Sequence, residues 1–90
     1  MKVRWTNRAL RDVADAYSYV AGENEEAAGR LAARLMSAGD RLADHPRMGR
    51  PVQEGRRLIV VDRFVVIYRV AGSEVRILRV VHGARRRKGP

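Results

Sequence analysis

Two stretches in the first half of the chain carry apolar residues at intervals of three and four, which predicts two amphipathic helices. The apolar positions of the first are Leu10, Val13, Ala14, Tyr17, Val20 and Ala21, and those of the second are Ala28, Leu31, Ala32, Leu35, Met36, Leu42 and Ala43. Thr6 or Asn7 can cap the first helix and Asn24 the second. We expect Gly22 to end the first helix in a left-handed conformation. The second should end at His45, because a residue before proline disfavours helical geometry.

After residue 51 the apolar pattern changes to short runs of β-branched residues. Residues 58–61, 64–71 and 75–81 are predicted to be strands, and residues 3–5 a short opening strand. The connections 62–63 and 72–73 are short enough for hairpins, whereas residues 47–51 should form a loop. The resulting order, β-α-α-β-β-β, predicts an α+β fold in which a helical hairpin packs on one face of an antiparallel sheet.

The length and charge of the chain limit what this fold can be. Ninety residues suffice for a single domain, which we assign to residues 1–90. Nineteen Lys and Arg side chains outnumber ten Asp and Glu, giving a net charge of +9. Residues 75–90 contain six basic side chains and no acidic one, and we expect a basic tail at residues 83–90. Such a segment favours nucleic acid, acidic protein segments or anionic surfaces, unless it is simply a solvated end.

Several classes of site are excluded by composition. The chain has no cysteine, so disulfides and thiolate metal sites are excluded, and a reducing cytoplasm fits. It has no apolar run of membrane-spanning length and no apolar block at its start, so we expect a cytoplasmic protein without a membrane partner. His45 and His82 have no partner at metal-ligand spacing, and no phosphate-binding loop or nucleophile set is present. We therefore expect no metal and no cofactor.

Several segments match a known pattern when they are taken together. Trp5 precedes Ala9, Asp12 and residues 17–20, and a P-x-x-G-R loop occupies residues 46–50. A Y-R-V strand lies at residues 68–70, and V-x-H-x-x-R closes the pattern at residues 80–85. Over nearly the whole chain these segments resemble the ParE branch of the RelE/ParE type II toxin–antitoxin superfamily. The resemblance implies the β-α-α-β-β-β fold and a toxin that a cognate ParD-like antitoxin neutralises.

The superfamily divides by mechanism: RelE-like and YoeB-like members cut mRNA on the ribosome, whereas ParE-like members poison DNA gyrase. Metal-free RNA cleavage needs a base, a cation and an acid. Where YoeB-like members place a glutamate, an arginine and a tyrosine, this chain has Val52, Val65 and Gly83; it retains only His82. The resemblance thus favours a gyrase inhibitor without catalytic residues. The alternatives are a RelE-type ribosome-dependent mRNA endonuclease and a plain nucleic-acid-binding module.

Candidate residues follow for each partner. The residues expected to contact gyrase, or DNA through the basic tail, are Arg79, His82, Arg85, Arg86, Arg87 and Lys88. For an endonuclease, Arg50, Arg56, Arg57 and Arg79 could supply cations. Leu10, Val13 and Tyr17 are candidates for the antitoxin groove, although a buried core is the favoured interpretation for Leu10 and Val13.

Overall fold

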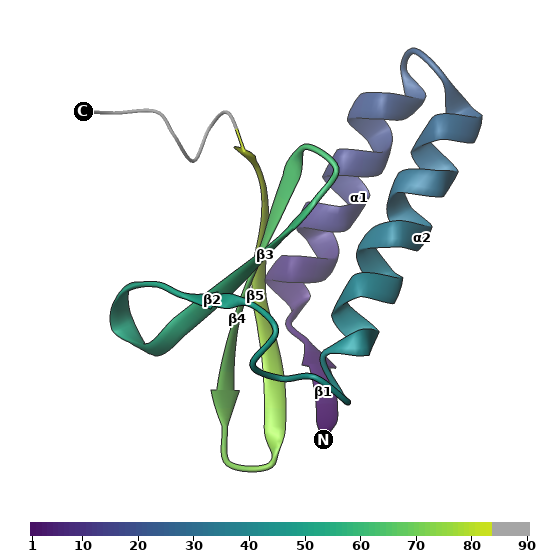
Figure 1. Cartoon of the computed structure of the whole chain (residues 1–90). Coiled ribbons are helices and arrows are strands. Elements are labelled where there is room, and N and C mark those ends of the chain that lie inside the picture. Colours follow the sequence, from purple (N-terminus) through teal and green to yellow (C-terminus); the bar gives the residue numbers. More distant parts are fainter. Residues whose placement is uncertain (84–90) are drawn as a thin grey trace.

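The computed structural model describes residues 1–83, in which two helices pack on a five-stranded sheet (Figure 1). The elements are β1 (Lys2–Trp5), α1 (Asn7–Ala21), α2 (Glu25–Arg41), β2 (Arg50–Pro51), a 3-10 turn η1 (Gln53–Gly55), β3 (Arg56–Val61), β4 (Phe64–Ala71) and β5 (Glu74–His82). The α+β class and the helical hairpin on one face of the sheet are confirmed. Neither helix is long and apolar enough to cross a membrane within this described part of the chain.

Side-chain caps set the N-terminal ends of both helices as the sequence predicts, but the C-terminal ends of both helices differ from the prediction. The Thr6 hydroxyl accepts a hydrogen bond from the Ala9 amide at 3.1 Å, and Asn24 Oδ1 accepts one from the Ala27 amide at 3.0 Å. Gly22 is right-handed (φ −58°), so the left-handed ending is wrong; its amide still bonds within the last turn, to the Ser18 carbonyl. Helix α2 ends at Arg41, before His45, because Leu42 and the residues after it form tighter turns.

The strand order is β1-β5-β4-β3-β2, with antiparallel pairing everywhere except between β1 and β5. β1 runs parallel to β5, which corrects the expectation of a wholly antiparallel sheet. Parallel strands need a long crossover connection. The helical hairpin of α1 and α2 provides part of it, because it carries the chain across the sheet between β1 and the later strands. Residues 47–51 are not all loop: Arg50 and Pro51 form β2, the short edge strand paired with Leu58 and Arg57.

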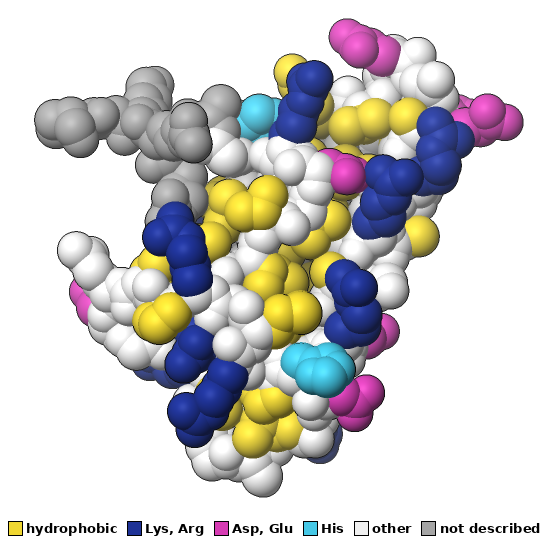
Figure 2. Space-filling model, in the orientation of Figure 1, with side chains coloured by type: hydrophobic (Ala, Val, Ile, Leu, Met, Phe, Trp, Pro, Cys, Tyr) yellow, Lys and Arg dark blue, Asp and Glu magenta, His cyan; other side chains and the backbone are white. Residues whose placement is uncertain are grey.

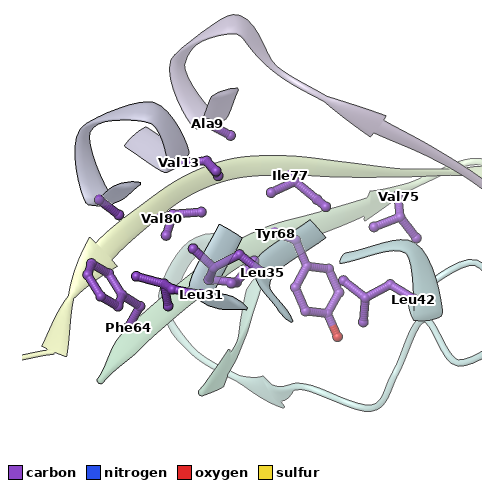
Figure 3. Packing of buried hydrophobic residues seen from close by; sticks show 12 residues of the cluster. Ala9, Val13, Leu31, Leu35, Leu42, Phe64, Tyr68, Val75, Ile77 and Val80 are labelled. Atoms are coloured by element: carbon purple, nitrogen blue, oxygen red, sulfur yellow. The ribbon is translucent and has the colours of Figure 1, made fainter. Parts of the chain in front are cut away.

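The core lies between the helices and the inner face of the sheet, and Tyr68 on β4 is its largest fully buried side chain. Figure 3 shows Tyr68 among Leu35, Leu42, Val75 and Ile77, contributed by α2 and β5. The Tyr68 hydroxyl donates to the Pro46 carbonyl and accepts from the Gly49 amide, each at 2.8 Å. A phenol at the centre of an apolar core is thereby satisfied, and the P-x-x-G-R loop is fixed against the sheet.

The inner and outer faces of the sheet follow from the alternation along β4. Phe64, Val66 and Tyr68 belong to the core cluster, whereas Val65 and Arg69 point to the face turned away from the helices. A bulge at β5, opposite Ile67 and Tyr68, shifts this alternation, so that Ile77 and Val80 both face the core. The side chains in the second half of β5 therefore point to different faces than an unbroken alternation would give, and Val80 faces the core.

Candidate functional site

A recess lies between α1 and the last residues of β5. β1 pairs with β5 only from Glu74 to Ile77, so the outer edge of β5 beyond Ile77 faces α1 instead of another strand. A cleft of about 480 Å³ opens there. Its lining residues are Arg8, Asp12, Asp15, Ala16, Tyr19, Phe64, Arg79, Val80, Val81 and His82.

Asp12 anchors this cleft, and its side chain is only 7% exposed. Its Oδ2 accepts hydrogen bonds from Arg79 Nε at 2.8 Å and from the Val80 amide at 2.9 Å. Its Oδ1 lies 3.4 Å from Nε of Arg8, one helical turn earlier on α1. The negative charge of Asp12 is thus neutralised by arginine side chains. Its carboxylate also accepts the hydrogen bond of the Val80 amide, which lies on the edge of β5 beyond the end of β1. Both of its oxygens are engaged, which makes Asp12 a structural anchor and not a free base.

The opposite wall of the cleft is aromatic. The rings of Phe64 and His82 meet edge to face, with centroids 5.2 Å apart and an interplanar angle of 75°. Tyr19 stands at the rim with 77% of its surface exposed. The described residues contain no cluster of His, Asp and Glu that could hold a metal ion. An apolar wall with a polar rim suits the binding of a protein segment or another ligand by contact.

The structure brings together only part of the predicted site. Arg79 and His82, both predicted to contact the target, line the cleft. Arg85, Arg86, Arg87 and Lys88 lie outside the described residues. Their contact with a target stays a prediction.

The three residues predicted to bind the antitoxin differ in their solvent exposure. Val13 belongs to the core, as its alternative assignment expected, but Leu10 and Tyr17 are 43% and 40% exposed, so the expectation that Leu10 is buried is wrong. The inner face of α1 is formed by Ala9, Asp12, Val13 and Ala16. The apolar stripe was therefore misplaced by about one residue, because small alanines and a paired carboxylate, not the larger apolar side chains, face the sheet.

Sequence reasoning placed Asp12 in the family pattern but not in the site, and it missed Asp15, Tyr19 and Phe64 as well. One signal was available for Asp12: it lies three residues after Ala9 and four before Ala16, so it shares their face of the helix. A carboxylate on a buried helix face requires a cationic or amide partner from elsewhere in the fold. Nothing in the sequence showed that this partner was on β5.

Comparison with known proteins gives a consistent result. The family model described as the ParE toxin of type II toxin–antitoxin system, parDE, matches residues 3–87. Toxin RelE2 of Caulobacter vibrioides is 41% identical over 85 residues, covering 93% of this chain and 97% of that protein. Among solved structures, a chromosomal ParDE system from P. aeruginosa superposes with a TM-score of 0.79 at 27% identity, covering 91% of this chain and 95% of that one. The toxin–antitoxin complex RelBE2 from Mycobacterium tuberculosis gives a TM-score of 0.70 at 25% identity, with coverages of 90% and 95%.

Proposed function

Because the chain belongs to the ParE/RelE family of type II toxin–antitoxin toxins, we propose that it is a non-catalytic inhibitor of DNA gyrase that a cognate ParD-like antitoxin neutralises. The observation that carries the proposal is the chemistry of two neighbouring positions, Val65 and Gly83. A Cβ atom on Gly83 would lie 4.0 Å from Cγ2 of Val65, so the two residues are adjacent at one end of the sheet. Neither can accept a proton or bind a phosphate, whereas a YoeB-like nuclease has reactive side chains at the corresponding positions.

Three of the four arginines that could serve an endonuclease make contacts within the protein. Arg57 Nη1 donates to the Gly49 carbonyl at 2.7 Å, and Arg56 pairs with Glu54 at 3.0 Å. Arg79 is paired with Asp12 on the helix side of the sheet. The contacts of Arg57 and Arg79 support a structural role for these two guanidinium groups and favour inhibition by binding over RNA cleavage.

The decisive experiment adds purified protein to gyrase and relaxed plasmid. We expect loss of supercoiling and accumulation of cleaved DNA bound to the enzyme. In a parallel reaction, the same amount of protein is added to an extract translating a reporter mRNA, and the transcript should stay intact. Normal supercoiling at stoichiometric excess of the toxin would contradict gyrase inhibition, and cleaved transcripts would establish the endonuclease alternative.

The antitoxin contact is proposed at the exposed side of α1. Leu10 and Tyr17 lie seven residues apart, so they share one face of the helix and together present an apolar strip. An acidic, apolar segment of the antitoxin would bury this strip, and the +9 charge of the toxin would accelerate the encounter. Co-expression with the product of a short neighbouring gene tests this. Leu10→Asp with Tyr17→Asp should abolish co-purification, whereas Arg30→Gln on the exposed side of α2 should leave it unchanged.

A further inference from the structure

Four arginines from four adjacent strands lie in one row across the sheet. Arg4 of β1 is opposite Arg76 of β5, Arg76 is opposite Arg69 of β4, and Arg69 is opposite Arg56 of β3. Residues directly opposite one another in a sheet project from the same face. Their neighbours along the strands, Val75 and Tyr68, face the helices, so the arginine row (Arg4, Arg76, Arg69 and Arg56) lies on the outer face.

The row is only partly neutralised by the protein. Like charges placed directly opposite each other destabilise a sheet. Glu74 lies 3.1 Å from Arg76, and Glu54 lies 3.0 Å from Arg56. Within residues 1–83 Arg4 has no ion pair. Arg69 Nη2 donates to the Glu54 carbonyl at 2.8 Å, and its Nε is buried. The exposed guanidinium group of Arg4 is therefore unused, and the four arginines with their two glutamates keep a net positive charge.

The distribution of charge along the chain places three of the four arginines of the row, Arg56, Arg69 and Arg76, in a strongly positive half. Residues 1–45 contain seven basic and seven acidic side chains, whereas residues 46–90 contain twelve basic and three acidic ones. The whole net charge of +9 therefore belongs to the half that contains β2 to β5. Figure 2 shows the acidic side chains mainly over the helices and their connecting turn in that view. Residues 46–83, which contain β2 to β5, carry eight of these basic side chains and all three acidic ones, so this part of the sheet layer is basic.

The density of negative charge distinguishes between polyanions. Adjacent strands are about 4.8 Å apart, so four arginines span about 14 Å. A DNA duplex carries one negative charge about every 1.7 Å of its axis, counting both strands. An extended acidic peptide presents side chains on one face only about every 6.8 Å, so it carries less charge over the same length. The guanidinium group also fits phosphate oxygens with two parallel hydrogen bonds.

The outer face lacks a platform for stacking bases. Trp5, Phe64 and Tyr68 pack against the core or belong to it, and Tyr17 and Tyr19 lie on α1. Single-stranded nucleic acids are usually bound with aromatic stacking, whereas a duplex backbone requires only cations. We propose that the arginine row binds the phosphate backbone of duplex DNA without reading its sequence. This is a DNA-binding surface separate from the basic tail, and it does not depend on which target the toxin inhibits.

The test measures binding of the full-length protein to a short fluorescent DNA duplex by anisotropy at several salt concentrations. Arg4→Gln with Arg76→Gln removes two exposed cations of the row. The control, Arg11→Gln with Arg30→Gln, removes two exposed cations from the helices and gives the same net charge. We expect the row variant to lower the slope of log K against log salt by about 2, since each phosphate contact contributes about 0.9. The control should keep the wild-type slope.

Each other outcome overturns the proposal. Equal losses in the two variants would mean that only net charge matters, and an unchanged slope in the row variant would assign DNA binding to another surface. An RNA duplex and a polyglutamate peptide serve as competing probes. Tighter binding of the RNA duplex, or a row-dependent loss confined to polyglutamate, would reassign the surface to that ligand. Because the assay contains no gyrase, failure to inhibit gyrase leaves this result unaffected.

Discussion

The carboxylate of Asp12 lies 2.8 Å from Nε of Arg79, joining α1 to β5 across 67 positions of the sequence. The same oxygen accepts the Val80 amide at 2.9 Å. One helix residue therefore binds the stretch of β5 that extends beyond its pairing with β1, and it lines the cleft. The stability of the fold and the shape of the candidate site are linked at this point.

Asp12→Ala should destabilise the protein by about 2 kcal/mol, because the Val80 amide loses a buried acceptor and Arg79 loses its charge partner. Arg79→Gln should cost less than about 1 kcal/mol, because the Arg79 side chain is 41% exposed and the Val80 amide keeps its bond to Asp12. Urea unfolding of the two variants measures the difference.

The control is Asp15→Ala, which removes an exposed carboxylate from the same cleft and should change stability by less than about 0.5 kcal/mol. Equal losses for Asp12→Ala and Arg79→Gln would show that the ion pair, and not the amide bond, is the main contribution of Asp12.

The Tyr68 hydroxyl gives a second prediction about the core. Tyr68→Phe keeps the ring but leaves the Gly49 amide and the Pro46 carbonyl without their partner, so we expect a loss of about 2 kcal/mol. Tyr19→Phe removes the same group from a side chain that is 77% exposed, and it should be neutral. Thermal unfolding compares the two. A neutral Tyr68→Phe would mean that water replaces the hydroxyl in the loop.

Two glycines in the same helix should respond to alanine with opposite signs. A Cβ on Gly39 would lie 2.3 Å from Cζ2 of Trp5 and 2.7 Å from Cδ1 of Ile77, whereas a Cβ on Gly29 would meet nothing within 4 Å. Gly39→Ala should therefore destabilise by at least about 1 kcal/mol, despite the better helix propensity of alanine. Gly29→Ala should stabilise by about 0.5 to 1 kcal/mol. Denaturant midpoints of the pair decide this, and a stabilising Gly39→Ala would disprove the close packing of α2 on β1.

The sequence predicted the elements of the fold better than the site, and particular residues explain why. Apolar periods and the Thr6 and Asn24 caps are local signals, so they identified the helices and strands. The pairing of β1 with β5 depends on contacts more than 70 residues apart along the chain, and no local pattern encodes them. The partnership of Asp12 with Arg79 likewise exists only once the bulge in β5 has turned that strand toward α1.

The last prediction concerns the basic tail, in particular Arg85, Arg86 and Arg87. If the tail contacts gyrase or its DNA by charge, changing these three arginines to Gln should weaken growth inhibition by about tenfold or more, because long-range attraction is lost. Changing the same three to Lys keeps the charge and should retain most of the toxicity. A chain stopped after Gly83 retains the bond from its amide to the Arg63 carbonyl, at 2.8 Å, and should keep a wild-type circular dichroism spectrum while losing toxicity.

These variants distinguish charge from shape. Loss of toxicity in both the Gln and the Lys variants would indicate that the guanidinium groups make specific, bidentate hydrogen bonds with the target. Full toxicity of the chain stopped after Gly83 would place the target surface within residues 1–83, where the cleft formed by Asp12, Arg79 and His82 becomes the first region to mutate. Growth curves after induction, with protein levels matched by immunoblot, separate these outcomes from differences in expression.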